Sequence, residues 1–205
     1  MSEVQMLQKS DKQYASAIAR IHRAQIPGGL AALPLFAFVA LYRSLINDRQ
    51  NGFFVRLDND VVSGFVFGTV DDSTMYRRAV IRSAFAVVLG LLFLGLRPSR
   101  LLYFIRTALS ARQVLARGSG ETADAHLIAI AVQPGVEKRG VGRDLVTSLE
   151  SWLSSKAVRS YKVMTNNSNH NAIKFYQSCG FAEVGRQKHF PEEQVLFLKC
   201  LEVGL

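Results

Sequence analysis

The alternation of apolar and polar positions divides the first third of the chain into two helices followed by a hairpin. Apolar residues recur at helical spacing across residues 10–25 and, more densely, across residues 33–46, which predicts two helices with a buried face. Residues 52–58 and 61–69 are rich in β-branched and aromatic residues, and polar residues at 58–60 separate them. A β-hairpin with its turn at 58–60 is therefore predicted after the two helices.

The last third of the chain alternates strand-like with helix-like segments. Small and β-branched residues over 125–132 predict a strand that is covered on both faces. After a turn at Pro134 and Gly135, apolar residues at four-residue spacing predict a helix that ends at Ser154. The remaining predicted elements are a strand over 161–165, a helix carrying Tyr176, and a final pair of strands over 182–190 and 194–201. This order predicts an α+β fold in three layers (an α/β sandwich), with a mixed sheet and helices on both of its faces.

Length and composition indicate a single domain over residues 1–205. Of the 205 residues, 49% are hydrophobic and 20% are charged, which suits a globular chain with a full core. The first ten residues lack the features of a signal peptide, and Cys179 and Cys200 are expected to be buried free thiols. We therefore expect a cytoplasmic protein. The four histidines are scattered along the chain, so no metal site is predicted.

The turn after the strand at 125–132 has the composition of a phosphate site. Gly140 and Gly142 let the backbone curve and approach a ligand closely, and the helix that begins there presents unpaired N–H groups. Three basic residues add positive charge around the same point: Lys138, Arg139 and Arg143. A P-loop is excluded, because an arginine and an aspartate follow the last glycine where that motif has Lys and Ser or Thr. The pattern predicts a turn that binds a pyrophosphate.

A second motif begins with a polar turn. Residues 166–169 supply side chains of the kind that cap helix starts, and Gly180 is a C-terminal cap before Phe181. The short helix between them has an apolar stripe made of Ala172, Ile173, Phe175 and Tyr176. A short amphipathic helix that leads into another strand is therefore predicted.

The two motifs, in this order and at this separation, resemble those of the GNAT superfamily of acyl-CoA N-acyltransferases. The run Arg139-Gly-Val-Gly142 is similar to the end of the family's Arg/Gln-x-x-Gly-x-Gly/Ala loop, which binds the coenzyme A pyrophosphate. The run Asn169-x-x-Ala172-x-x-Phe175-Tyr176-x-x-x-Gly180-Phe181 is similar to its second signature. The chain departs from the family at Glu137, where Arg or Gln is usual, but the backbone amides of the loop do not depend on that side chain.

The resemblance implies a fold, a co-substrate and a set of binding residues. The implied fold is a GNAT-like mixed, mostly antiparallel sheet, with residues 73–120 as an insert between the second and third predicted strands. The implied co-substrate is acetyl-CoA, and no metal is implied. Backbone groups near Ala131 and Val132 would hold the pantetheine arm and polarise the thioester carbonyl. The implied coenzyme-binding residues are Ile130, Ala131, Val132, Lys138, Arg139, Gly140, Val141, Gly142, Arg143, Asn169 and Tyr176.

The implied reaction is direct transfer of the acetyl group to a primary amine, with a small molecule or an amino sugar favoured over a protein as the acceptor. Tyr176, carried over from the family motif, is the candidate general acid for the departing sulfur. The alternative function is that of a non-catalytic protein on the same scaffold, which binds coenzyme A or a membrane surface.

The general base is less well defined. His126 is the first candidate, because some members of the family carry a catalytic His or Glu at the start of this strand and an imidazole pKa of about 6.5 suits proton transfer. A buried structural histidine that shares a strand face with Ile128 and Ile130 is the equal alternative. The other candidate bases are Glu121, Asp124 and Asp71.

The insert at 73–120 has an unusual composition. It contains no Asp, Glu or Lys but eight arginines, which is most of the net charge of +9. The apolar run at 84–96 would form a helix about 20 Å long, short of the roughly 30 Å hydrocarbon core of a bilayer. Residues 97–99 interrupt the pattern, and a second helix is predicted over 100–116.

Three interpretations of the insert remain open. The first is a satellite core, in which the two helices pack on each other and on the acceptor side of the sheet. The second is a basic hairpin that lies on an anionic membrane, which would place the protein peripherally at the inner membrane face. The third is an arginine-lined pocket for a phosphorylated acceptor, or a homodimer interface. Nucleic acid is disfavoured, because few aromatic residues interleave with the charges.

Overall fold

A seven-stranded mixed sheet runs through the part of the chain that the structure describes. The structure is a computed structural model, and it describes residues 2–26, 29–96, 99, 102, 105–106, 123–136, 140–188 and 191–201. The strands are β1 (Ser2–Met6), β2 (Asn51–Asp58), β3 (Val61–Thr69), β4 (Ala125–Val132), β5 (Ser160–Asn166), β6 (Ala182–Lys188) and β7 (Glu193–Cys200). Their order in the sheet is β1-β2-β3-β4-β5-β7-β6. All neighbouring pairs are antiparallel except β4 and β5, which are parallel. The predicted mixed, mostly antiparallel sheet is therefore confirmed.

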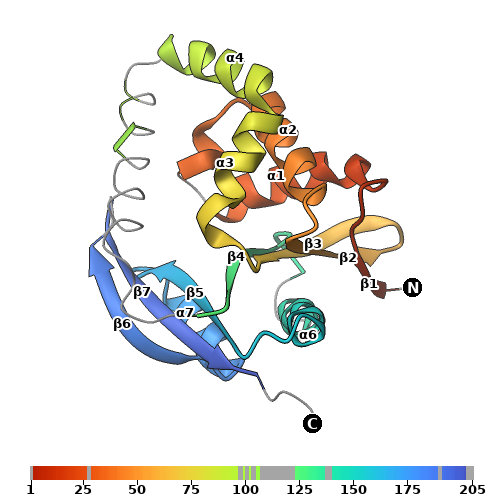
Figure 1. Ribbon diagram of the computed structural model, residues 1–205, viewed down its shortest axis with the longest axis vertical. Helices are drawn as coiled ribbons and strands as arrows, with labels where there is room; N and C mark the ends of the chain where they lie inside the picture. The colour runs from red at the N-terminus through yellow and green to blue at the C-terminus, as the bar shows by residue number, and fades with distance from the viewer. Residues whose placement is uncertain are drawn as a thin grey trace.

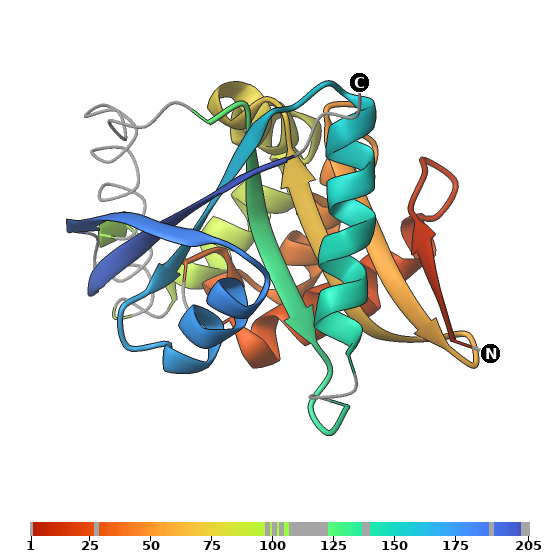
Figure 2. The same cartoon turned by 90° about the horizontal axis from the view of Figure 1, so that it is seen from below.

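Helices cover both faces of this sheet (Figures 1 and 2). They are α1 (Ala15–Gln25), α2 (Leu35–Ile46), α3 (Asp72–Arg82), α4 (Ala84–Gly95), α6 (Val141–Ser155) and α7 (His170–Ser178), and two 3-10 turns at Lys12–Tyr14 and Gly29–Ala32 precede α1 and α2. The helices α1 and α2 lie on one face, and α6 lies on the other. The three-layer arrangement follows from the two amphipathic patterns of the sequence, each of which buries its apolar stripe against one side of the sheet.

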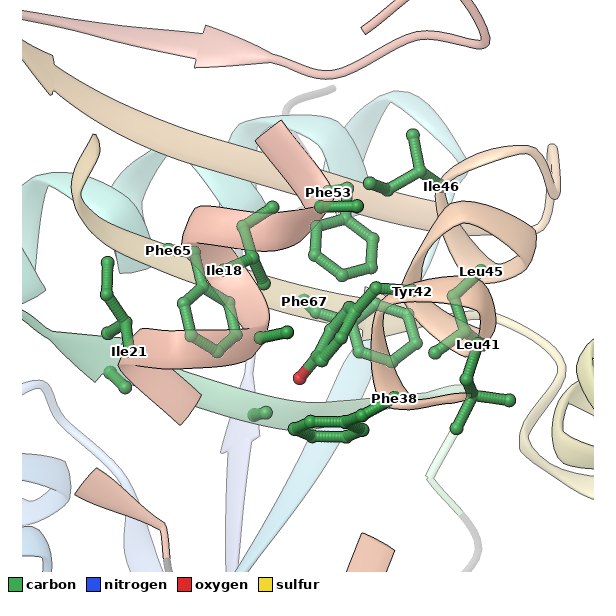
Figure 3. Packing of buried hydrophobic residues seen from close by; sticks show 14 of the residues in the cluster. Ile18, Ile21, Phe38, Leu41, Tyr42, Leu45, Ile46, Phe53, Phe65 and Phe67 are labelled. Atoms are coloured by element: carbon green, nitrogen blue, oxygen red, sulfur yellow. The ribbon is translucent and has the colours of Figure 1, made fainter. Parts of the chain in front are cut away.

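The first core lies between the sheet and the pair α1–α2, and it is aromatic (Figure 3). The rings of Phe53 and Phe67, on adjacent strands, stack with centroids 4.5 Å apart. Phe65 lies beside them, and Tyr42 of α2 packs edge-on against both Phe53 and Phe65. These large rings, nearly all of them inaccessible to solvent, fix α2 on the hairpin.

The second core lies between the sheet and α6. The residues of α6 that were predicted as its apolar stripe, among them Leu145 and Leu149, are fully buried there. At the far end of the helix, Trp152 lies so close to β2 that a Cβ atom on Gly52 would be 2.6 Å from the indole ring. A glycine at this position therefore lets the helix approach the strand.

Two elements were missed in the sequence. The strand β1 pairs with β2 alone, as an edge strand of five residues, too short for a clear periodicity. The helix α3 begins at Asp72, in a segment where no helix was predicted, because the side chain of Asp71 caps it and accepts a hydrogen bond from the backbone N–H of Thr74 (3.2 Å). The other predicted elements are present with boundaries shifted by a few residues. Most of the helix predicted over 100–116 lies outside the described residues.

The cysteines differ from the expectation. Both are free, but Cys179 is only half-buried and Cys200 is exposed. The expectation of two buried thiols was therefore wrong. Cys200 is the last residue of β7, beyond the part of that strand that is buried in the second core.

Candidate active site

A bulge in β4 shapes the centre of the sheet. Phe67 of β3 lies opposite Ala129 and Gly68 lies opposite Leu127, so Ile128 is an extra residue in the ladder. Ile128 and Ala129 consequently both face the first core, whereas Leu127 and Ile130 face the second. A bulge of this kind bends a strand and re-aims its side chains.

Beyond this bulge β4 separates from β5. The two parallel strands pair only from Ala125–Leu127 to Tyr161–Val163, although β5 continues to pair with β7 as far as Asn166. Figure 2 shows the two strands diverging towards their carboxyl ends. In the described part of the chain, residues 128–132 of β4 thus have a partner strand only on the β3 side. Their backbone groups on the β5 side form an edge that an extended ligand can pair with.

The helix α6 starts beside the end of β4 (Figure 2). Its N-cap is Gly140, whose φ of 80° is left-handed and which has no side chain to accept from the first N–H groups. By helix geometry these N–H groups have no partner within the helix, and they carry the positive end of its dipole. Val141 is buried and fixes the start of the helix on the sheet. The arrangement suits an anion such as a pyrophosphate.

The two sequence motifs meet at this point. A Cβ atom on Gly142 would lie 3.0 Å from the ring of Phe175, so the first turn of α6 is in contact with α7. Nη2 of Arg143 donates a hydrogen bond to the backbone oxygen of Ser178 (3.3 Å), which links the two helices a second time. Gly142 therefore has a packing role, and its predicted contact with a coenzyme stays a prediction.

Tyr176 is buried on α7 among aromatic rings. Its ring centroid lies 5.6 Å from that of Phe181 and 5.9 Å from that of Phe197. Burial raises the pKa of its hydroxyl above the ordinary value, and the charge of nearby Cys179 acts in the same direction. With its pKa raised, the phenol holds its proton at neutral pH, as a general acid must before it donates.

His126 lies in the closed part of the β4–β5 pair. It is buried and stands opposite Lys162 of β5 and Thr69 of β3. The bulge places it on the same face as Ile128 but not as Ile130, so the predicted shared face of all three residues was wrong. His126 is therefore one residue before Leu127, the last residue of β4 that pairs with β5, and its role as a base stays a prediction.

The alternative bases have structural roles where the structure describes them. Oδ2 of Asp124 accepts hydrogen bonds from the backbone N–H groups of Arg159 (2.9 Å) and Ser160 (3.2 Å), which joins the starts of β4 and β5. Asp71 caps α3 and forms an ion pair with Arg78. Glu121 lies outside the described residues.

The polar residues predicted around the coenzyme are only partly described. Oδ1 of Asn169 accepts a hydrogen bond from the backbone N–H of Ala172 (3.1 Å), so Asn169 is the N-cap of α7. Lys138 and Arg139 lie outside the described residues, as does Glu137. Ile130, Ala131 and Val132 lie on the open edge of β4 described above.

A partly buried histidine on the opposite face was missed in the sequence. Nδ1 of His22 on α1 lies 2.5 Å from the hydroxyl of Tyr42 on α2, and the imidazole stacks on Phe65 with centroids 6.1 Å apart. Phe65 is paired with Ala131 of β4, so this pair lies on the α1–α2 side of the open strand. Burial lowers the pKa of His22 to about 4, which keeps the ring neutral. Only the position of His22, four residues after Ile18 on the apolar side of α1, could have drawn attention to it.

The chain matches a known family in sequence and known proteins in structure. The model of the acetyltransferase (GNAT) family matches residues 17–181. The ribosomal-protein-S18-alanine N-acetyltransferase of Escherichia coli is similar in structure, with 16% identity and a TM-score of 0.59 over 100% of this chain and 97% of that chain. NAA60 of Arabidopsis thaliana, solved with acetyl-CoA, has 14% identity and a TM-score of 0.58 over 98% of each chain. An N-acetyltransferase of Staphylococcus aureus Mu50 has 13% identity and a TM-score of 0.59, over 98% of this chain and 99% of that one. No curated protein matches the sequence.

The fold and the family match define an N-acetyltransferase. The match covers well over half of the chain, and the chain belongs to the acetyltransferase (GNAT) family. The resemblance drawn from the glycine turn and the second motif is thereby confirmed.

Proposed function

We propose that the protein transfers an acetyl group from acetyl-CoA to a primary amine by direct attack, and that the amine belongs to a small molecule or an amino sugar. The observation that carries the proposal is the opening between β4 and β5. The start of α6, which has no side-chain cap, lies on one side of it, and α7, which carries Tyr176, lies on the other (Figure 2). That NAA60 of Arabidopsis thaliana was solved with acetyl-CoA supports the choice of co-substrate.

In this proposal the coenzyme binds along two elements. Its pyrophosphate accepts hydrogen bonds from the first N–H groups of α6, and Lys138, Arg139 and Arg143 add positive charge. Its pantetheine arm pairs with the open edge of β4 at Ile130, Ala131 and Val132, as an added strand would. This brings the thioester into the gap between the strands.

The transfer step then needs one base and one acid. The neutral amine attacks the thioester carbonyl, the new C–N bond forms, and backbone N–H groups of β4 stabilise the oxyanion. The C–S bond breaks, and the sulfur takes a proton from Tyr176, which solvent later replaces. The surplus proton of the amine goes to a base, for which His126 stays the candidate from the sequence, directly or through a water.

Thiol release from acetyl-CoA with a panel of amines tests the proposal, with mass spectrometry of the product to locate the acetyl group. Gly142→Arg should abolish both coenzyme binding and turnover, because the side chain collides with Phe175 and fills the first turn of α6. Gly185→Arg is the matched control, since open space surrounds Gly185 on β6. Coenzyme binding without thiol release for any amine would identify a non-catalytic coenzyme-binding protein instead.

A further inference from the structure

The helix α4 is apolar on all sides, yet much of it is exposed. Phe85 is 84% exposed, Leu92 is 66% exposed, and Leu96, directly after the helix, is 78% exposed. Val88 and Phe93 are also exposed on the same element. A contiguous apolar surface of this kind is rare on a soluble monomer and marks an interaction site.

The opposite side of α4 is fixed to the protein. Val87, Gly90 and Leu94 are buried, and a Cβ atom on Gly90 would lie 2.8 Å from that of Ala37 on α2. The close contact at Gly90 holds the helix against α2, so the exposed side is presented in a defined orientation. Figure 1 shows α4 at the end of the molecule opposite the C-terminus.

The end of α3 adds an exposed apolar residue to this surface, at a steep angle to α4. The two helices are bent by 88° at Ser83, and Ile81, directly before the bend, is exposed. Within the described residues no single helix is long and apolar enough to span a membrane. The bent pair α3–α4 reaches that length and hydrophobicity only when its two helices are taken together. The surface therefore suits contact along a plane.

The chain has a net charge of +9, and the segment that carries α3 and α4 contributes most of it. Residues 73–120 contain eight arginines and no acidic residue. Asp48, two residues after α2, pairs with Arg78 (2.7 Å) and Arg82 (3.1 Å), and Asp71 pairs with Arg78 as well. Arg77 is exposed on α3. A second copy of the chain would bring like charges together, whereas an anionic surface is complementary to them.

We infer that α4, with the exposed end of α3 and its exposed arginines Arg77 and Arg82, docks the protein on an anionic lipid surface. The apolar side chains of α4 enter the boundary between headgroups and acyl chains, while the arginines contact the lipid phosphates. The bilayer is contacted and not crossed. This inference does not depend on the acetyl transfer proposed above.

Flotation of the full chain with vesicles tests the inference. Vesicles of phosphatidylcholine with phosphatidylserine should carry the protein upward, whereas phosphatidylcholine alone should carry much less, and added salt should reduce the difference. The double variant Phe85→Glu with Leu92→Glu should no longer float, and Arg77→Gln should weaken binding about fivefold, which corresponds to about 1 kcal/mol for one arginine. Val61→Glu is the matched control, because Val61 is an exposed apolar residue (60%) at the hairpin turn.

Two measurements accompany the flotation. Thermal unfolding should be the same for the double variant and for Val61→Glu, since all three positions are exposed. Light scattering reports the oligomeric state. The inference is overturned if the double variant still floats with the vesicles, or if the wild type does not float. A dimer that the double variant dissociates, without flotation, would assign the surface to a second copy of the chain.

Discussion

The two faces of the sheet are covered in different ways. On one face α6 buries its apolar stripe completely, and its first turn meets α7 at the candidate active site. On the other face α1 and α2 cover the sheet, and α4 lies outside α2 with apolar side chains on both its inner and outer sides. The apolar residues of α6 are therefore buried on the first face, whereas part of the apolar surface of α4 stays exposed on the second.

The largest expected effect concerns the chemistry on the α6–α7 face. Tyr176→Phe should lower kcat by about 100-fold or more, in the usual range for loss of a general acid, with coenzyme affinity nearly unchanged because the ring still fills its site. Steady-state kinetics and calorimetry with coenzyme A give the two quantities. Tyr76→Phe, an exposed tyrosine on α3, should behave as the wild type. An unchanged kcat in Tyr176→Phe would remove the acid role.

Paired leucine truncations compare the two faces directly. Leu149→Ala should lower the free energy of unfolding by about 3 kcal/mol, because a fully buried side chain leaves a cavity. Leu92→Ala on α4 should change it by less than about 0.5 kcal/mol, because that side chain is exposed. Urea unfolding measures both. A large loss for Leu92→Ala would show that α4 is covered in solution.

The partly buried His22 predicts a pH dependence of stability for the α1–α2 face. The folded-state pKa of His22 is lowered to about 4, below the ordinary value of about 6.5 in an unfolded chain. The unfolded state therefore binds the proton first as the pH falls, and the stability from this group is complete above about pH 6.5 and lost towards pH 4. We expect a loss of about 2 kcal/mol across that window. His22→Gln should flatten this part of the profile in urea unfolding, and an unaltered slope would contradict the assignment.

The smallest effect is expected at the N-cap of α7. Asn169→Ala should lower the free energy of unfolding by about 1 kcal/mol, since the N–H of Ala172 loses its acceptor. Asn169→Ser retains an acceptor and should restore most of the stability. If the alanine variant also binds coenzyme A much more weakly than the serine variant, the side chain contacts the coenzyme as the family resemblance implied.

Candidate site residues could be identified where they belong to a local sequence motif. Gly140 stands where the backbone is left-handed, which glycine allows, and Tyr176 belongs to a motif with fixed spacing. Both could therefore be named as candidates without coordinates. The amphipathic stripe of α6 likewise fixed which of its sides faces the sheet. The contact between Gly142 and Phe175 then gives a physical reason for the two motifs to occur together.

The features that were missed depend on tertiary context. The pair of His22 and Tyr42 joins two helices whose relative placement no local pattern encodes. The apolar run of α4 has no polar side, so its sequence could not indicate which residues would be buried against α2. The face assignment of His126 failed because the bulge at Ile128 depends on pairing with β3 and leaves no mark in the sequence.

That one unpaired residue in β4 changes the phase of the strand. Upstream of Ile128 the odd-numbered positions point to the second core, and downstream the even-numbered positions do. Deletion of Ile128 would remove the bulge and leave a regular alternation, in which Ala131 and Val132 keep the sides that they have now. The extra residue therefore sets the bend of β4, and the cores on its two sides would be disturbed less by its loss than by the loss of a neighbouring residue.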